Sequence, residues 1–319
     1  MEYGLALMHR GSSAFVPLSK DEYEAIGTAT DRLLEYTAIE EKFDLIVENL
    51  MELEMAFLEA SVQTMLQGSQ DHRWFQDKRR FFNRRLLNFM SAAKAYVDQV
   101  PQHFHRAFPG DQGAADRLDA SFSEQYDARI GYRTMEALRN YAQHNGDPLH
   151  SASFGSIWDE ERTKMKFSVE PVLHPSELRA RNELRNRSLK SKYKKDLFKI
   201  TVLKELEEIG DQVDIKFSVR DYIEGLWAVH AELRDVIGSK VKSWIGVIRE
   251  AMTRFQDEHP SEKMICLAAV IMRDNGSLSS AINVAEDFLK YIDYLVRKNS
   301  SCAGLARKYV SSEIAEPKK

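Results

Sequence analysis

Cysteine, proline and glycine are scarce in this 319-residue sequence, and each shortage excludes a class of protein. Only two cysteines occur, Cys266 and Cys302, which excludes a disulfide framework and a cysteine-rich zinc site and makes a reducing cytoplasm the expected compartment. Eight prolines and 15 glycines are too few for a β-sandwich, a β-barrel or a collagen-like chain. The composition therefore leaves room for long helices.

Long apolar runs and a strong excess of one charge are also missing. No stretch approaches the roughly 18 consecutive apolar residues of a membrane-spanning helix, and the first residues lack the pattern of a signal peptide, so we expect no membrane association. The formal net charge of −4 excludes a globally basic nucleic-acid coat but allows a local basic patch. A hydrophobic share of 43% beside a charged share of 29% is typical of a globular chain with a buried core.

Helical periodicity dominates the first half of the chain. Apolar residues recur at three- and four-residue steps over three stretches, and long helices with short breaks between them predict an antiparallel bundle. Ser19 and Glu22 predict a capping box, in which each side chain binds the other's backbone NH at the start of a helix. The expected elements are a short strand at 3–8 and helices at 30–66, 73–100 and 115–144, with breaks at Gly68, Pro101 and 109–113.

Composition changes near residue 150, so we expect a helical bundle over 1–154 and a helical domain with short strands over 155–319. The tetrapeptide Lys-Phe-Ser-Val occurs at 166–169 and again at 216–219. Because each copy alternates polar and apolar residues, we expect a small two-stranded β element within a mainly α fold. The other expected helices span 177–209, 220–258, 261–274 and 277–297.

Common catalytic and metal-binding motifs are absent. The sequence has no phosphate loop, no dinucleotide-binding glycine motif, no HExxH and no GxSxG. His103 and His105 can in principle bind a metal, but no carboxylate or third ligand is placed beside them, so two surface histidines are the better interpretation. We therefore expect neither a metal ion nor a small-molecule cofactor.

A polar stripe on the predicted helix 115–144 is the candidate site. Residues four apart share a helix face, which aligns the members of the stripe. Arg139 and His144 nevertheless point about 140° apart on an ideal helix, so they can act together only at a loosened helix end or across a partner chain. The stripe consists of Arg133, Glu136, Asn140 and His144, with Arg139 and Gln143 beside it.

A histidine, an arginine and a polar amide are sufficient for metal-free RNA cleavage. His144 can take the proton of a ribose 2′-hydroxyl or protonate the leaving oxygen. The guanidinium of Arg139 can hold the phosphate and the charge that builds on it, while Asn140 orients either group. The same Arg-x4-His spacing recurs at 254–259, where phenylalanine follows the arginine, so the spacing alone is weak evidence.

Arg139-Asn140 followed by His144, at the end of the third expected helix, resembles the motif of the HEPN superfamily: an arginine, a polar residue and a histidine a few residues later. The resemblance covers at most residues 20–150. It implies a metal-independent endoribonuclease that acts as a homodimer, with the two motifs meeting in one cleft. Toxin–antitoxin and antiviral defence systems contain such proteins, which implies RNA, tRNA included, as substrate and an antitoxin or other regulatory protein as partner.

Two alternatives to the nuclease stay open. Some family members have lost catalysis, which leaves a non-catalytic dimeric module that binds a partner protein, a nucleotide or RNA. The stripe is also compatible with an ordinary solvated helix face, in which Arg133 and Glu136 form an i,i+3 ion pair.

Two basic clusters are candidate RNA-binding surfaces, because phosphates attract clustered lysine and arginine side chains. A charge run is also common on a solvated helix face, so phosphate contact is one of two interpretations. The first cluster consists of Lys78, Arg79, Arg80, Arg84 and Arg85, and the second includes Lys190, Lys192, Lys194 and Lys195.

Overall fold

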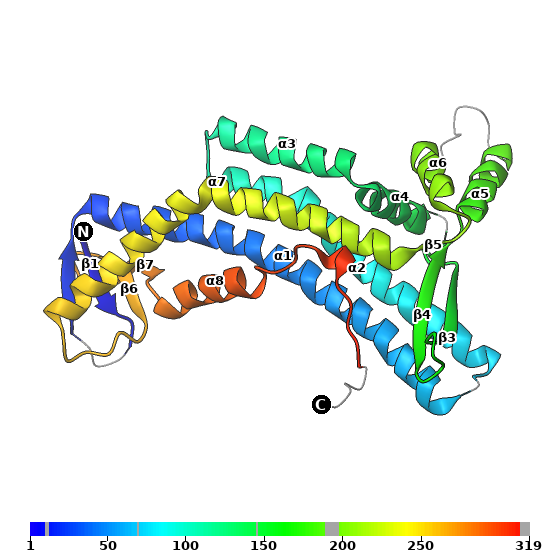
Figure 1. Ribbon diagram of the computed structural model, residues 1–319. Helices are drawn as coiled ribbons and strands as arrows, with labels where there is room; N and C mark the ends of the chain where they lie inside the picture. Colours follow the sequence, from blue (N-terminus) through cyan, green and yellow to red (C-terminus); the bar gives the residue numbers. More distant parts are fainter. Residues whose placement is uncertain (10–12, 69, 145, 189–197, 313–319) are drawn as a thin grey trace. The chain divides into compact units, whose positions relative to one another are not determined.

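The computed structural model of the chain (Figure 1) describes residues 1–9, 13–68, 70–144, 146–188 and 198–312, with the backbone alone at 185–188. This part of the chain is mainly helical, as expected, and contains two small antiparallel sheets. The helices are α1 (Lys20–Gln67), α2 (His72–Ala107), α3 (Gln112–Ala128), α4 (Ile130–His144), α5 (Pro175–Ser188), α6 (Ile200–Ile209), α7 (Ile215–Glu258) and α8 (Glu286–Lys298). The strands are β1 (Glu2–Leu7), β2 (Phe15–Leu18), β3 (Ser151–Trp158), β4 (Met165–Leu173), β5 (Val213–Asp214), β6 (Leu267–Met272) and β7 (Leu278–Asn283).

The chain divides into two compact units, each assembled from three separate stretches. Helices α1, α2, α3 and α7 each contribute residues to both units. This partition differs from the single division expected between residues 154 and 155. Unit 1 comprises residues 1–44, 95–119 and 231–300, and unit 2 comprises residues 45–94, 120–230 and 301 onward.

Unit 1 contains a four-stranded antiparallel sheet, sheet A, in the order β2-β1-β6-β7 (Figure 1). The first four residues of β6, Leu267 to Val270, are buried. We expected a buried helix over 261–274, and that prediction is wrong. A short continuous apolar run suits a buried strand as well as a buried helix, and here β1 and β7 supply the hydrogen-bonding partners. The predicted helix over 277–297 likewise begins as strand β7 and is helical only in α8.

The capping box predicted from Ser19 and Glu22 is confirmed, and α1 begins there rather than at residue 30. The backbone NH of Ser19 donates to Glu22 Oε2 at 2.6 Å, and the NH of Glu22 donates to Ser19 Oγ at 3.1 Å. These two bonds form the expected capping box at the first turn of α1. The helix ends at Gly68, whose φ of 71° is in the left-handed region that glycine adopts without strain.

Proline does not end the second helix where we expected. Pro101 lies inside α2, which continues to Ala107. Proline removes one backbone hydrogen bond, but the fully buried side chains of Val100 and Phe104 hold both sides of the interruption in the core of unit 1. Packing therefore overrides the local preference.

The predicted helix 115–144 is two helices, α3 and α4, separated at Arg129. Asp221 of α7 stabilises the break, because its Oδ1 accepts a hydrogen bond from Arg129 Nη1 at 2.7 Å and its Oδ2 accepts one from the NH of Gly131 at 2.8 Å. A Cβ atom at Gly131 would lie 2.7 Å from the carbonyl oxygen of Ser218, so only glycine fits this close approach to α7.

Unit 2 contains a three-stranded antiparallel sheet, sheet B, in the order β3-β4-β5. The first Lys-Phe-Ser-Val copy lies in β4, as expected, but the second forms the first turns of α7, so the predicted two-stranded element is wrong. The side chain of Asp214 accepts a hydrogen bond from the NH of Lys216 at 2.9 Å and caps α7. The predicted helix 177–209 corresponds to α5 and α6, with 189–197 outside the described residues.

Candidate functional site

The expected motif lies on α4, in unit 2, and α4 is helical through His144. Arg139 and Asn140 are half-buried, whereas Gln143 and His144 are exposed. The opposite face of α4 is buried in the core of unit 2 through Met135, Leu138 and Tyr141, among others. The polar stripe is therefore the accessible side of a helix that is otherwise well packed.

Arg133 is held by other parts of unit 2. Its Nη2 donates to Glu205 Oε2 of α6 at 2.6 Å, and its Nη1 donates to the carbonyl oxygens of Tyr126 and Asp127 at 2.9 Å and 2.5 Å. The guanidinium therefore satisfies carbonyls at the end of α3 while it ties α4 to α6. Arg133 positions the helix and has little capacity left for a substrate.

Glu136 is also held, through a buried tyrosine. The hydroxyl of Tyr222 on α7 donates to Glu136 Oε1 at 2.6 Å, and the Tyr222 ring packs edge-on against Tyr132, with 4.7 Å between ring centroids. Burial and the Glu136 carboxylate raise the pKa of Tyr222 well above its usual value, while the positive charge of Arg139 acts in the opposite direction. Arg139 therefore lies near this hydrogen bond.

The guanidinium of Arg139 has no hydrogen bond or ion pair with any of the described residues. It is half-buried beside α7, while His144 is exposed at the last residue of α4. Since α4 stays helical between them, five residues turn the two side chains about 140° apart. No loosened helix end brings them together among the described residues of α4.

The buried side of α4, next to the Arg139–His144 motif, contacts a cluster of side chains that the sequence did not indicate. The hydroxyl of Tyr141 accepts a hydrogen bond from Arg181 Nη1 of α5 at 2.5 Å, and the Tyr141 ring packs edge-on against His150, with 6.0 Å between ring centroids. The His150 side chain is 3% exposed, and burial, together with the nearby Arg181 charge, lowers its pKa to about 4. His150 is therefore neutral at pH 7 and acts as a packing group.

A buried asparagine brings the basic cluster of α2 close to the end of α4. Asn83 Oδ1 accepts a hydrogen bond from the NH of Leu149 at 2.8 Å, and Asn83 Nδ2 donates to the carbonyl oxygen of Leu149 at 3.3 Å. Leu149 follows His144 by five residues, so the two Cα atoms lie within about 18 Å. The basic residues within about one turn of Asn83 are Arg79, Arg80, Arg84 and Arg85.

Two basic residues of this cluster, Lys78 and Arg85, turn toward α1. Lys78 Nζ lies 3.2 Å from Glu59 Oε1, and Arg85 forms an ion pair with Glu52. These pairs neutralise both cations and leave them poorly placed for RNA. Arg84 is exposed, with its guanidinium 5.2 Å from the centre of the Phe81 ring, and is the member most accessible to a phosphate.

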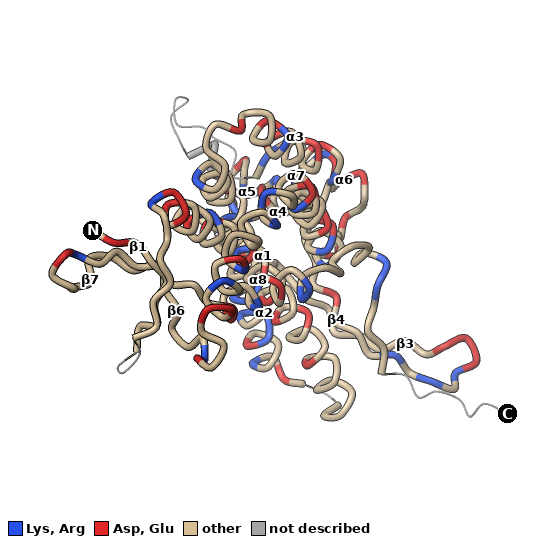
Figure 2. Tube along the Cα trace, turned by 90° about the vertical axis from the view of Figure 1, so that its left-hand side faces the viewer, with Lys and Arg blue, Asp and Glu red and all other residues tan. Residues whose placement is uncertain are grey.

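The rest of the predicted RNA-binding set divides in two. Arg80 is exposed and forms an ion pair with Asp77 one turn earlier on the same helix. Lys190, Lys192, Lys194 and Lys195 lie outside the described residues. Figure 2 shows that basic and acidic positions are interspersed along the helices, so no helix of the described chain presents one sign of charge throughout.

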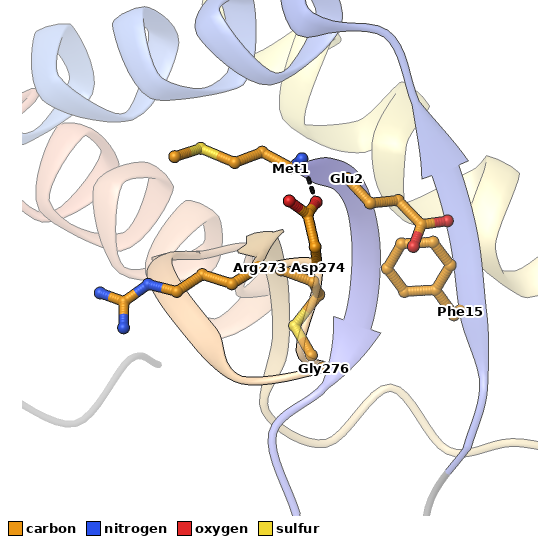
Figure 3. Close-up of a pocket in the computed structure, with 7 residues that line it drawn as sticks. Met1, Glu2, Phe15, Arg273, Asp274 and Gly276 are labelled. Carbon is orange, nitrogen blue, oxygen red and sulfur yellow. Dashed lines mark hydrogen bonds and ion pairs between the residues drawn. The ribbon is translucent and has the colours of Figure 1, made fainter.

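A hollow of about 370 Å³ lies at the end of sheet A in unit 1 (Figure 3). The amino group of Met1 forms an ion pair with Asp274 Oδ1 at 2.7 Å, Glu2 lies beside the ring of Phe15, and the side chain of Arg273 points away (Figure 3). No residue of the predicted site lines this hollow. Asp274 is already paired with the Met1 amino group, and Arg273 points away, so the hollow does not compete with α4 as the candidate site.

Neither a metal-binding cluster nor a membrane-spanning helix occurs in the described part of the chain. It contains no cluster of three or more histidine, cysteine, aspartate or glutamate side chains that could hold a metal ion. Within those residues no helix is both long and apolar enough to cross a lipid bilayer.

Comparison with known proteins yields no relative. No family model matches the chain, and neither a curated protein nor a solved structure matches it. The functional interpretation consequently rests on the chemistry of the residues and on their arrangement.

Proposed function

We propose that the protein is a cytoplasmic, metal-independent endoribonuclease of the HEPN type, with Arg139, Asn140 and His144 as its catalytic residues. The observation that carries the proposal is the state of Arg139. It is a half-buried arginine near an accessible histidine, and none of the described residues binds its guanidinium. An arginine with no partner among the described residues is available to a phosphate.

His144 acts in this proposal as the general base or acid. It is exposed at the end of α4, where an RNA strand can reach it without displacing core residues. It takes the proton of the 2′-hydroxyl, the oxygen attacks the adjacent phosphorus, and the 5′-oxygen leaves with a proton. The products are a 2′,3′-cyclic phosphate and a 5′-hydroxyl, so no metal-bound water is needed.

Arg139 stabilises the negative charge that builds on the phosphate in the transition state, and Asn140 orients the phosphate or the imidazole. Because Arg139 and His144 diverge on one helix, the complete site takes Arg139 from one chain and His144 from a second copy. Arg79, Arg80 and Arg84 of α2 bind the flanking phosphates, which makes RNA affinity fall with salt. A role in toxin–antitoxin or antiviral defence, with a regulatory protein that holds the enzyme inactive, follows from the HEPN resemblance.

The test is cleavage of total RNA and purified tRNA in EDTA, with the native protein beside His144→Ala and Gln143→Ala. Gln143 is the matched control, since it is the exposed neighbour of His144 on the same helix. We expect His144→Ala to reduce the cleavage rate by about 10²–10⁴-fold and Gln143→Ala to change it by less than about threefold. Cyclic-phosphate ends on the products identify the 2′-hydroxyl as the nucleophile. Equal cleavage by native protein and His144→Ala contradicts the proposal.

The second candidate is a non-catalytic module of the same fold that binds RNA, a nucleotide or a partner protein. The divergence of Arg139 and His144 favours it, because each chain alone presents two separate polar groups and no assembled catalytic pair. This candidate predicts that native protein and His144→Ala are equally inert while Arg84→Ala weakens RNA binding. Titration of fluorescent RNA at two salt concentrations measures that binding.

A further inference from the structure

Helix α1 carries an exposed apolar stripe in unit 2 that none of the preceding functions uses. Its members share one narrow face of the helix, at steps of four, three, four and three residues. Each is between 41% and 61% exposed, although apolar residues of this size are usually buried. We call this stripe the α1 seam, and it consists of Met51, Met55, Leu58, Val62 and Met65.

The opposite face of the same helix segment is already packed. Leu50, Leu53, Phe57 and Ala60 are buried in the core of unit 2. The seam is therefore a second apolar face on a helix whose core-forming face is complete. Its exposed area is about 500 Å², which is as large as the largest apolar patches on typical monomeric proteins.

The seam is close to symmetric about Leu58. Its other members lie three and seven residues before Leu58 and four and seven residues after it. An antiparallel copy of α1 therefore places Leu58 against Leu58 on a two-fold axis and Met51 against Met65, with Met55 and Val62 one residue out of register. A seam whose centre and ends match in reverse is suited to a second copy of this chain.

The charges beside the seam fit the same occupant. Acidic residues flank it, and each forms an ion pair within the chain: Glu59 with Lys78, Glu52 with Arg85, and Glu54 with Arg220. Because these pairs neutralise the flanks, a second copy meets little like-charge repulsion, and a nucleic acid or a strongly charged peptide gains nothing there. Two copies bury about 1,000 Å² in the seam, the lower bound for a specific interface, before flanking residues are counted.

We propose that two copies of the chain associate through antiparallel α1 helices, with Leu58 at the two-fold axis. The inference is independent of RNA cleavage, since it rests on the spacing, exposure and neutral flanks of the seam. A nuclease that fails to cleave RNA can still dimerise here, and a dimer that forms here can lack nuclease activity. Both proposals involve a second copy of the chain, but they are tested apart, since Leu58→Glu reports on this interface and His144→Ala on RNA cleavage.

The first experiment measures mass in solution for the full chain by light scattering and sedimentation over a concentration series. We expect twice the mass of one chain for the native protein, and a dissociation constant at least tenfold higher for Leu58→Glu, which places two like charges on the axis. Leu45→Glu is the matched control, because Leu45 is an equally exposed leucine of α1 about 120° away from the seam. Its dissociation constant should equal that of the native protein, and circular dichroism checks that both variants fold.

The second experiment fixes the orientation by disulfide cross-linking, with exposed Cys266 replaced by serine. Leu58→Cys should form a disulfide dimer by itself. Met51→Cys should cross-link only when mixed with Met65→Cys, since the antiparallel arrangement separates the two copies of position 51. A monomeric native protein, a dimer unaffected by Leu58→Glu, or self-cross-linking of Met51→Cys would each overturn the proposal.

Discussion

The two halves of α4 differ in whether their polar side chains are bound by other helices. In the first half, Arg133 and Glu136 are held by partners on α6 and α7, through Glu205 and Tyr222. In the second half, Gln143 and His144 are exposed, and Arg139 has no hydrogen-bond or ion-pair partner among the described residues. Polar residues at equivalent helical spacing can thus stabilise the fold in one turn and remain available for chemistry two turns later.

Hydrogen-bond partners separate the two roles better than residue type or burial does. Arg133 and Arg139 are both half-buried arginines on the same helix, yet the first binds three acceptors. A bound arginine contributes to folding, whereas an arginine without partners costs desolvation energy that a ligand can recover. This comparison predicts that substitutions of Arg133 or Glu136 lower stability, and that substitutions of Arg139 or His144 change activity at nearly constant stability.

The largest effect on stability at neutral pH is expected for Arg133→Ala. The change removes an ion pair to Glu205 and leaves two carbonyl oxygens at the end of α3 without their donor, which costs about 2–3 kcal/mol of unfolding free energy. Denaturant titration measures it. Arg80→Ala is the control, since that ion pair is exposed and should contribute less than about 0.5 kcal/mol. Equal effects of the two variants would remove the distinction between the halves.

Tyr222→Phe should have a smaller effect, about 1–2 kcal/mol. The aromatic packing remains, but Glu136 loses a hydrogen bond of 2.6 Å and its carboxylate stays half-buried. RNA cleavage should stay within about twofold of the native rate, because the hydroxyl belongs to the structural half of the helix. A variant that keeps native stability but no longer cleaves RNA would show that Tyr222 and Glu136 take part in catalysis.

Acid should destabilise the second half of α4, where the buried ring of His150 packs against Tyr141. The unfolded imidazole takes up a proton near pH 6.5, whereas the folded one takes it up only near pH 4, so stability is complete above pH 6.5 and falls as the pH drops toward 4. The loss of unfolding free energy should stay below about 1 kcal/mol down to pH 6 and reach about 2–3 kcal/mol at pH 4.5. Unfolding free energies of native protein and His150→Phe, measured from pH 7 to pH 4.5, should diverge in this range. Parallel curves would show that His150 does not contribute.

Features that depend on neighbouring residues were predictable from the sequence. The capping box of Ser19 and Glu22 involves residues three apart. The apolar residues that recur along α1 are the ones that form its buried face. The accessible side of α4 was predictable for the same reason, because the 100° step per residue places the polar stripe opposite the core.

Features that depend on distant partners were not predictable. The break at Arg129 is stabilised by Asp221, 92 residues further along the chain, and the apolar run in β6 becomes a strand because β1 pairs with it. Glu205 and Tyr222 likewise decide which residues of the stripe are bound, and they lie on other helices. The second Lys-Phe-Ser-Val copy is an exception, since Asp214, two residues before it, was an available sign of a helix start.

The pairing of β1 with β6 imposes a waiting time on every newly made molecule. Leu7 pairs with Leu267, so one edge of β1 has no partner until the last part of the chain leaves the ribosome. At about 5–20 residues per second, that interval lasts roughly 13–50 s. An open strand edge is a template for pairing with other chains. The yield of correctly assembled protein therefore depends on what shields this edge during translation.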